Sequence, residues 1–310
     1  MKSLIITIDT EADNQWDVDK RPTTQNSNYI PRFQELAETV DFVPTWLVTY
    51  EMLQDTALVS YLKPKALSKK CEIGAHLHAW NNPPEFPLSR TGQGRDYLIE
   101  YPEEAMRAKM TCLLNEMDSK FGIRITSHRS GRWALDDRYI DILADEGIIV
   151  DCSVTPGVNW STSLGATGLP GSDYSACSSR PSLLRPGLLE VPMTIAPKRF
   201  FCAGNVRSVR SALGEVRRLA LGRPCWFRPF PHYSANLLKA LLRDVYKDEN
   251  SDYAMFMIHS SELMPGGSPS FPDAESIERL YAILEDVFSS ACEMGFRGIS
   301  LSDYAKKYFG

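Results

Sequence analysis

The stretch Glu72-Ile73-Gly74-Ala75-His76-Leu77-His78-Ala79-Trp80 contains two histidines directly after an apolar run and is followed by Asn81-Asn82-Pro83-Pro84. If the run is a strand, residues two apart point to the same face. His76 and His78 would then project together where the strand ends. Neutral imidazoles are the commonest protein ligands of zinc-like metals. The alternative is one core histidine beside one exposed histidine, and the rest of the chain bears on that choice.

Outward from this stretch, strand-like and helix-like segments alternate along the whole chain. Further strands are predicted at residues 3–8, 42–50, 123–126, 148–150, 188–194, 254–258 and 297–301. Helices are predicted at about 31–40, 58–69, 102–121, 135–146, 206–221, 234–246 and 277–291. This alternation is typical of a parallel α/β sheet, and about seven or eight such units favour a barrel. An open doubly wound sheet is the second choice, because no glycine-rich phosphate-binding motif follows any strand.

The composition restricts the class of protein. The 310 residues are 43% hydrophobic and 24% charged, which is ordinary for a globular protein, and the formal net charge is -5. We therefore expect one domain spanning residues 1–310, with no nucleic-acid partner and no transmembrane segment. Seven scattered cysteines without a Cys-x-x-Cys pair indicate reduced thiols and a cytoplasmic location.

Polar residues follow other predicted strands in the same way as the two histidines. They are Asp9 and Glu11, with Asp13 in the same alternation, and then Arg129, Asp151 and His259. In a parallel barrel the carboxyl ends of the strands converge on the face where active sites are built. One carboxylate and two imidazoles form an open metal site that can activate water. A further histidine can donate a proton, and an arginine beside a carboxylate keeps it ionised. The pattern predicts metal-assisted hydrolysis.

The sequence resembles the NodB-like polysaccharide deacetylases, carbohydrate esterase family 4 and its relatives. Five short motifs carry the resemblance in the order of the family. They are Thr7-Ile8-Asp9-Thr10-Glu11, Glu72-Ile73-Gly74-Ala75-His76-Leu77-His78, Arg129-Ser130-Gly131-Arg132-Trp133, Asp151-Cys152-Ser153 and Ile258-His259. The resemblance implies a distorted (β/α)7-type barrel. Within the family the chain resembles the WbmS-like branch, which is linked to bacterial O-antigen synthesis.

The resemblance also implies roles for the motif residues. Asp9 would be the catalytic base, tethered by Arg129, and His259 the general acid. Glu11, His76 and His78 would bind a divalent metal, expected to be zinc. Asp151 would line the substrate groove.

Three departures from the family motifs affect these roles. The first motif usually has two adjacent aspartates, so Asp13 remains an alternative to Glu11 as ligand. The two histidines are usually four residues apart rather than two. Proline usually stands at the position of Gly131, so a different local backbone is expected.

The expected substrate is a small-molecule or lipid-linked amide sugar from surface polysaccharide biosynthesis, and an oligomer is left open. Trp80, Trp133 and Trp16 could stack on a sugar ring or simply pack, and Glu262 is a further substrate-binding candidate. His128 is expected to be a supporting or surface residue, and His232 a structural one. Two alternatives stand beside the sugar deacylase: an amide hydrolase of the same fold with a non-sugar substrate, and an inactive binding protein of glycan assembly.

Overall fold

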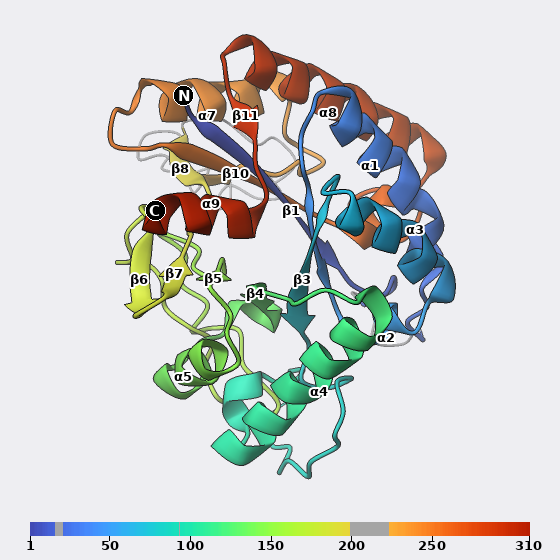
Figure 1. Ribbon diagram of the computed structural model, residues 1–310, viewed down its shortest axis with the longest axis vertical. Helices are drawn as coiled ribbons and strands as arrows, with labels where there is room; N and C mark the ends of the chain where they lie inside the picture. Colours follow the sequence, from blue (N-terminus) through green and yellow to red (C-terminus); the bar gives the residue numbers. More distant parts are fainter. Residues whose placement is uncertain (16–20, 93, 199–222) are drawn as a thin grey trace, which may run out of the picture.

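A computed structural model of the protein describes residues 1–15, 21–92, 94–198 and 223–310. Strands and helices alternate through these ranges (Figure 1). The strands are β1 (Ser3–Thr10), β2 (Thr45–Val48), β3 (Glu72–Leu77), β4 (Ser127–Ser130), β5 (Val150–Asp151), β6 (Ser182–Arg185), β7 (Leu188–Glu190), β8 (Ile195–Lys198), β9 (Arg223–Trp226), β10 (Tyr253–His259) and β11 (Arg297–Gly298). The helices are α1 (Ile30–Thr39), α2 (Tyr50–Leu53), α3 (Thr56–Leu67), α4 (Glu103–Phe121), α5 (Asp137–Asp145), α7 (Ala235–Lys247), α8 (Ala274–Glu293) and α9 (Leu301–Phe309), and a 3-10 helix, η5 (Ser260–Leu263), follows β10. The predicted helix at 206–221 lies outside the described residues.

One curled sheet forms the centre of the molecule. Its strand order is β10-β1-β2-β3-β4-β5-β7-β6, with β11 also paired to β1, and every pair is parallel except β6–β7. The segment after β7 runs on toward β10, where Thr194 Oγ1 accepts a hydrogen bond from the Met255 N–H at 2.8 Å. The sheet is therefore an incomplete barrel, and the predicted distorted (β/α)7-type barrel is confirmed. A separate antiparallel pair, β8–β9, was not predicted.

Alternation along β1 separates the inside of the barrel from the outside. Leu4, Ile6 and Ile8 belong to the large cluster between the sheet and its helices. Ile5 belongs to a second, interior cluster that also contains residues of β5, β7, β10 and α9. Because successive side chains of a strand point to opposite faces, Asp9 shares the interior face with Ile5.

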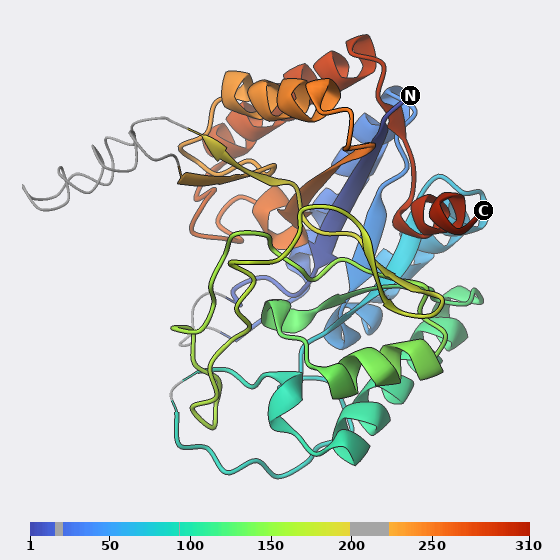
Figure 2. The same cartoon turned by 90° about the vertical axis from the view of Figure 1, so that its left-hand side faces the viewer.

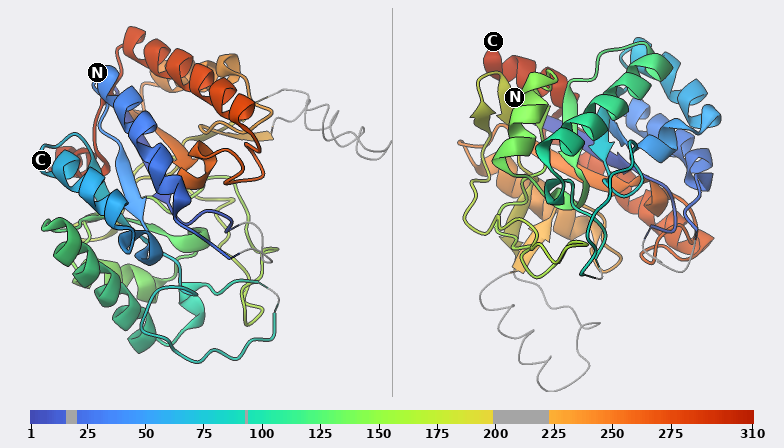
Figure 3. Two further views of the ribbon diagram at one scale, coloured as in Figure 1. Left: turned by 90° about the vertical axis from the view of Figure 1, so that its right-hand side faces the viewer. Right: turned by 90° about the horizontal axis from the view of Figure 1, so that it is seen from below.

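The outer layer consists of helices whose apolar faces cover the sheet. Helices α1, α3 and α8 lie along one side of the molecule and α4 and α5 along another (Figures 1 and 3). Asp55, Asp136 and Asp273 cap α3, α5 and α8 by accepting hydrogen bonds from first-turn N–H groups. None of the helices within the described ranges is both long and apolar enough to cross a bilayer.

The two ends of the barrel differ. Helix α9 places Leu301, Tyr304 and Ala305 in the interior cluster. The long connections after β3 and β5 lie on the side of the molecule away from both chain termini (Figure 2). They surround the carboxyl ends of the strands, where the sequence predicts the site.

Three local predictions are wrong. The fourth strand is the polar segment Ser127–Ser130, not residues 123–126. This strand is buried although its residues are polar, and its polar groups find hydrogen-bond partners inside the protein: Ser130 N–H donates to Ser153 Oγ at 2.8 Å. Because its residues are not hydrophobic, a hydrophobic pattern did not identify it as a strand. Strand β6 lies in a predicted loop, and helix α9 follows β11 where no helix was predicted.

Candidate active site

The interior faces of β1 and β3 bring four of the predicted site residues together. Asp9 ends the interior row of β1, and Glu11 lies two residues beyond it. On β3, Ile73, Ala75 and Leu77 belong to the outer cluster, so His76 points inward. Both carboxylic residues and both histidines are at least 95% buried.

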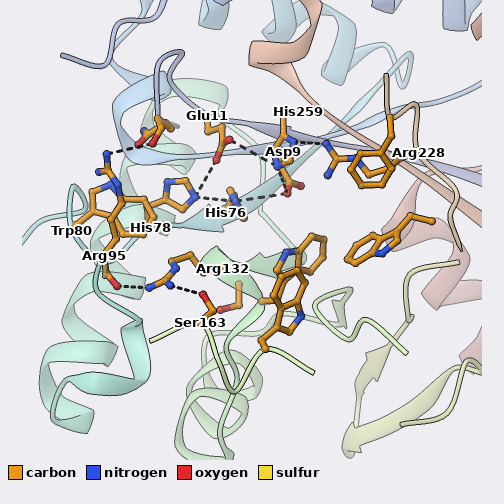
Figure 4. Close-up of a pocket in the computed structure, with 16 residues that line it drawn as sticks. Asp9, Glu11, His76, His78, Trp80, Arg95, Arg132, Ser163, Arg228 and His259 are labelled. Atoms are coloured by element: carbon orange, nitrogen blue, oxygen red, sulfur yellow. Dashed lines mark hydrogen bonds and ion pairs between the residues drawn. The ribbon is translucent and has the colours of Figure 1, made fainter. Parts of the chain in front are cut away.

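Glu11, His76 and His78 form a compact set of possible metal ligands. One donor atom from each lies within 4.8 Å of the other two. Nε2 of His78 is 3.1 Å from Nε2 of His76 and 3.2 Å from Oε2 of Glu11 (Figure 4). His76 Nδ1 lies 2.8 Å from the carbonyl oxygen of Arg129, so Nδ1 carries the proton and Nε2 offers its lone pair to the centre.

The protonation of this set also fits a divalent cation. Burial lowers the pKa of His76 to about 4 and holds that of His78 well below its usual value, so both imidazoles are neutral. Burial raises the pKa of Glu11 to about 8. A buried carboxylate of this kind is stabilised in its ionised form by a bound cation. The cluster therefore offers two neutral imidazoles and one carboxylate, and a bound cation would stabilise the charge of that carboxylate.

Asp9 differs from Glu11 because a guanidinium holds it. Nη1 of Arg129 lies 2.5 Å from Oδ1 of Asp9, and Nη2 donates to Thr7 Oγ1 at 2.9 Å. Burial alone would raise the pKa of Asp9, but Arg129, His76 and His259 lower it below its ordinary value. Asp9 is therefore ionised at neutral pH.

His259 ends β10 opposite Asp9, its register partner on β1. Its Nε2 lies 3.8 Å from Oδ2 of Asp9 and 3.9 Å from Oε1 of Glu11. Its Nδ1 lies 3.3 Å from Oε2 of Glu262, which also accepts from the backbone N–H of His259 at 3.0 Å. Burial opposes protonation, yet Glu11 and Glu262 raise the pKa of His259 above its usual value. The ring can thus hold a proton close to both carboxylates.

These side chains open into a cavity of about 470 Å³. Five aromatic side chains line it: Trp80, Trp133, Trp160, Trp226 and Phe230. Three arginines also line it, namely Arg95, Arg132 and Arg228 (Figure 4). A ligand in this cavity would contact the predicted ligands and acid–base groups together with aromatic and cationic walls.

Comparison with known proteins relies on structure. No protein-family model matches the chain, and no curated protein matches its sequence. A protein from Mycobacterium smegmatis assigned as a polysaccharide deacetylase superposes with a TM-score of 0.57 at 14% identity, covering 99% of this chain and 90% of that one. A protein from Parabacteroides distasonis assigned as a glycoside hydrolase/deacetylase gives 0.63 at 11% identity, covering 99% and 70%. The chain has the polysaccharide deacetylase fold.

The polysaccharide deacetylase fold is compatible with more than one activity. An allantoinase also superposes on this chain, with a TM-score of 0.53 at 12% identity, covering 99% of this chain and 89% of that one. At such identities the likeness concerns the fold alone. The choice of reaction therefore depends on the residues of the site.

Asp151, predicted to line the substrate groove, is not among the described residues that line the cavity. Val150 packs in the interior cluster, so the next residue of β5, Asp151, points to the outer face. Its carboxylate is fully buried, 2.6 Å from Nδ1 of His128, whose Nε2 lies 2.7 Å from the Tyr139 hydroxyl. Asp151 thus belongs to a network between the sheet and α5, and His128 is a buried supporting residue rather than a surface one.

Two other predicted residues have roles set by their partners. The carboxylate of Asp13 is occupied, because it accepts hydrogen bonds from the N–H and hydroxyl of Thr23 at 3.1 and 2.7 Å. Glu11, not Asp13, therefore lies in the ligand cluster. Glu262 is 2% exposed and accepts a hydrogen bond from Nη2 of Arg228 at 2.7 Å. It therefore positions Arg228 and His259 and does not itself line the cavity.

Of the predicted aromatic residues, Trp80 and Trp133 line the cavity, whereas Trp16 lies outside the described residues. His232 is exposed and stacks on Phe230. Sequence reasoning missed Arg95, Arg228 and Trp160 as cavity residues, since each lies in a segment without periodic pattern or motif. Arg132 was quoted within a motif but given no role.

Proposed function

We propose that this chain is a metal-dependent hydrolase that removes an N-acyl group, such as acetyl, from an amide sugar. The observation that carries the proposal is the meeting, in one cavity, of the Glu11, His76 and His78 cluster with an ionised Asp9 and a protonatable His259. A cation bound to this cluster would lower the pKa of water and polarise a carbonyl group.

In the proposed reaction, Asp9 takes a proton from the water whose oxygen attacks the carbonyl carbon. Arg129 keeps Asp9 ionised and fixes its orientation. His259 gives a proton to the amide nitrogen as the carbon–nitrogen bond breaks. The products are a carboxylic acid and a free amine. Glu262 orients His259 through the ring and the backbone N–H.

A sugar is favoured over a non-sugar amide by the cavity wall. Trp133 and Trp226 lie edge to face at 5.6 Å, and Trp160 and Trp226 at 6.2 Å. Flat aromatic faces stack well on the C–H faces of a sugar ring. From the resemblance of the motifs we further propose a cytoplasmic enzyme of surface polysaccharide or O-antigen biosynthesis, with a nucleotide-linked or lipid-linked substrate and zinc as the metal.

Metal content and reaction products test the proposal. Protein purified without chelator should contain about one divalent ion per chain, and His76→Ala should lose it. His232→Ala, which removes an exposed histidine, is the matched control and should keep it.

Incubation with N-acyl amino sugars should release the acid and the amine in equal amounts. Hydrolysis of a ureide or a cyclic imide, with none of the sugars hydrolysed, would favour the non-sugar hydrolase. A chain without metal, even after soaking in zinc or cobalt, and without any product would favour the binding protein.

A further inference from the structure

One end of the cavity carries positive charge that the described residues do not neutralise. Arg95 and Arg132 both line the cavity, and no described carboxylate lies within ion-pair distance of either guanidinium. Nη2 of Arg95 makes one long hydrogen bond, 3.4 Å to the carbonyl oxygen of Gln15. A guanidinium has five N–H donors in a planar fork that matches an oxyanion. As far as the described residues show, most donors of Arg95 are therefore available to a ligand.

Among the described residues, the groups in direct contact with the Arg132 guanidinium are neutral. Its Nη2 donates to Ser163 Oγ at 3.0 Å and to the Leu164 carbonyl oxygen at 3.2 Å, and its Cζ lies 3.9 Å from the centre of the Tyr97 ring. The backbone at Arg132 has φ 56°. A residue other than glycine adopts this left-handed conformation only where the surroundings enforce it. The fold thus keeps a fixed cation in the cavity wall that makes no ion pair with any described carboxylate, although Glu100 and Asp96 lie close enough to favour its charge.

The charges around the rest of the cavity are paired. Asp9 is paired with Arg129, and Glu262 with Arg228. Glu11 is the one remaining carboxylate among the described lining residues, and under the proposed function it binds a cation. With that cation present, the cavity has a clear excess of positive charge, which attracts anionic ligands and disfavours cationic ones.

Arg95 lies near the ligand cluster, next to the Trp80 ring that stacks on His78. The His78 and Trp80 rings are stacked with centres 4.3 Å apart, and Cζ of Arg95 lies 5.1 Å from the Trp80 ring. The distance from Cζ of Arg95 to the centre of the His78 ring is therefore at most the sum of these two distances. Figure 4 shows Arg95, Trp80 and His78 grouped at one side of the cavity, so a sugar whose acyl carbonyl reaches the cluster would lie on the side where Arg95 stands.

We infer that the substrate carries an oxyanion, and that Arg95 binds it while Arg132 adds to the local positive field. The inference rests on the proposed function and specifies its substrate class: an N-acyl sugar bearing either a phosphate or a carboxylate. Both groups offer two oxygens that can accept the pair of parallel N–H bonds of a guanidinium.

Binding of simple anions tests the site without requiring turnover. Pyrophosphate and glucuronate are titrated separately into the full chain in the His76→Ala background, so that a metal ion cannot hold the probe. Arg95→Gln should weaken binding by roughly tenfold or more at low salt, whereas Arg95→Lys should keep part of it. Arg279→Gln, which removes an exposed arginine of α8, is the control and should change nothing. Equal binding with and without Arg95 would overturn the inference.

Kinetics then link the site to the reaction. Deacylation of N-acetylglucosamine 1-phosphate and of N-acetylglucosaminuronic acid is compared with that of the neutral methyl glycoside. The anionic substrate should be preferred in kcat/KM, and Arg95→Gln should remove the preference by raising KM. Preference for the phosphate or for the uronic acid identifies the source of the oxyanion.

Failure of the anion site and failure of the proposed reaction give different results. Anion binding that depends on Arg95, in a chain that deacylates none of these sugars, would support the anion site and count against the proposed reaction. Efficient turnover of the neutral glycoside, unaffected by Arg95→Gln, would support the reaction and overturn the anion site.

Discussion

The backbone carbonyl oxygen of Arg129 lies 2.8 Å from Nδ1 of His76, its register partner on β3. The hydrogen bond fixes the tautomer of His76 and turns its Nε2 lone pair toward Glu11 and His78. The guanidinium of the same arginine pairs with Asp9. Arg129 thus orients a predicted metal ligand with its backbone and a predicted base with its side chain.

Replacing the Arg129 side chain should separate these two effects. Arg129→Met leaves the buried Asp9 unpaired, which should lower the free energy of unfolding by about 3–5 kcal/mol. The carbonyl oxygen remains, so the folded variant should still bind metal. Denaturant titration and metal analysis measure the two quantities. The double variant with Asp9→Asn should recover much of the stability, and metal loss in a well-folded single variant would contradict this view of Arg129.

Glu11 and Asp13 should respond differently to loss of charge. Glu11→Gln removes the anionic donor of the cluster, and metal affinity should fall by at least roughly 100-fold. Asp13→Asn disturbs the hydrogen bonds to Thr23 and should cost about 1–3 kcal/mol in unfolding free energy, with metal affinity unchanged. Isothermal titration with zinc distinguishes them. The opposite pattern would make Asp13 the ligand.

The positions of the polar residues along the sequence were enough to predict which side chains meet at the centre of the site. Asp9, His76 and His259 could be predicted because each is the last or the last-but-one residue of a strand, and a parallel barrel brings strand ends together. The period of two explains how His-x-His could replace a wider spacing of ligands, since His76 and His78 lie on the same side of the chain.

The sequence was less informative where burial and polarity conflict. Strand β4 is polar but buried, so a hydrophobic pattern pointed to the segment before it. Asp151 lies at the carboxyl end of a strand, close to the position that Asp9 has in β1, yet its side chain faces outward. The sequence could not predict this orientation, because a strand only two residues long has too little alternation to show which residue faces inward. Arg95 and Trp160 reach the cavity from loops, whose course depends on tertiary contacts rather than on local pattern.

Gly131 occupies the position where the family motif has proline, and its surroundings explain why a small residue stands there. A Cβ at this position would lie 2.3 Å from the Leu77 carbonyl oxygen and 2.8 Å from Cδ2 of His78. Gly131→Ala should therefore displace β3 locally, cost about 1–3 kcal/mol and weaken metal binding through His78. Gly157→Ala is the control, because its Cβ would meet no atom within 4 Å. It should cost about 1–2 kcal/mol through its left-handed backbone and leave metal binding intact. Equal metal affinity in both variants would show that His78 tolerates the shift.

His259 should matter for turnover but not for metal content. Its Nε2 lies 3.9 Å from Glu11, and it is outside the ligand cluster. His259→Ala should lower kcat by about 10²–10⁴-fold, the usual contribution of a general acid. Metal analysis on the same preparation is the control. Parallel loss of metal and activity would make His259 a ligand instead.

Glu262 should make stability depend on pH in the acid range. Burial opposes its ionisation, but Arg228 and His259 lower its pKa to about 2, against an ordinary value of 4.5. A lowered carboxyl pKa stabilises the fold above the unfolded-state value, and that stabilisation is lost as the pH falls toward the folded-state value. The contribution is on the order of 3 kcal/mol and should fade between about pH 4.5 and 2.

Denaturant titrations of the wild type and Glu262→Gln across this range measure the effect. The variant should be less stable near neutral pH, and the difference should shrink as the pH falls through this window. His259 is protonated throughout the window in both folded and unfolded chains, so its own titration does not contribute to the change. Glu278→Gln, at an exposed pair with Arg32, should show little difference at any pH. A difference for Glu262→Gln that stays constant with pH would mean that the carboxylate acts by packing alone, and not by its charge on Arg228 and His259.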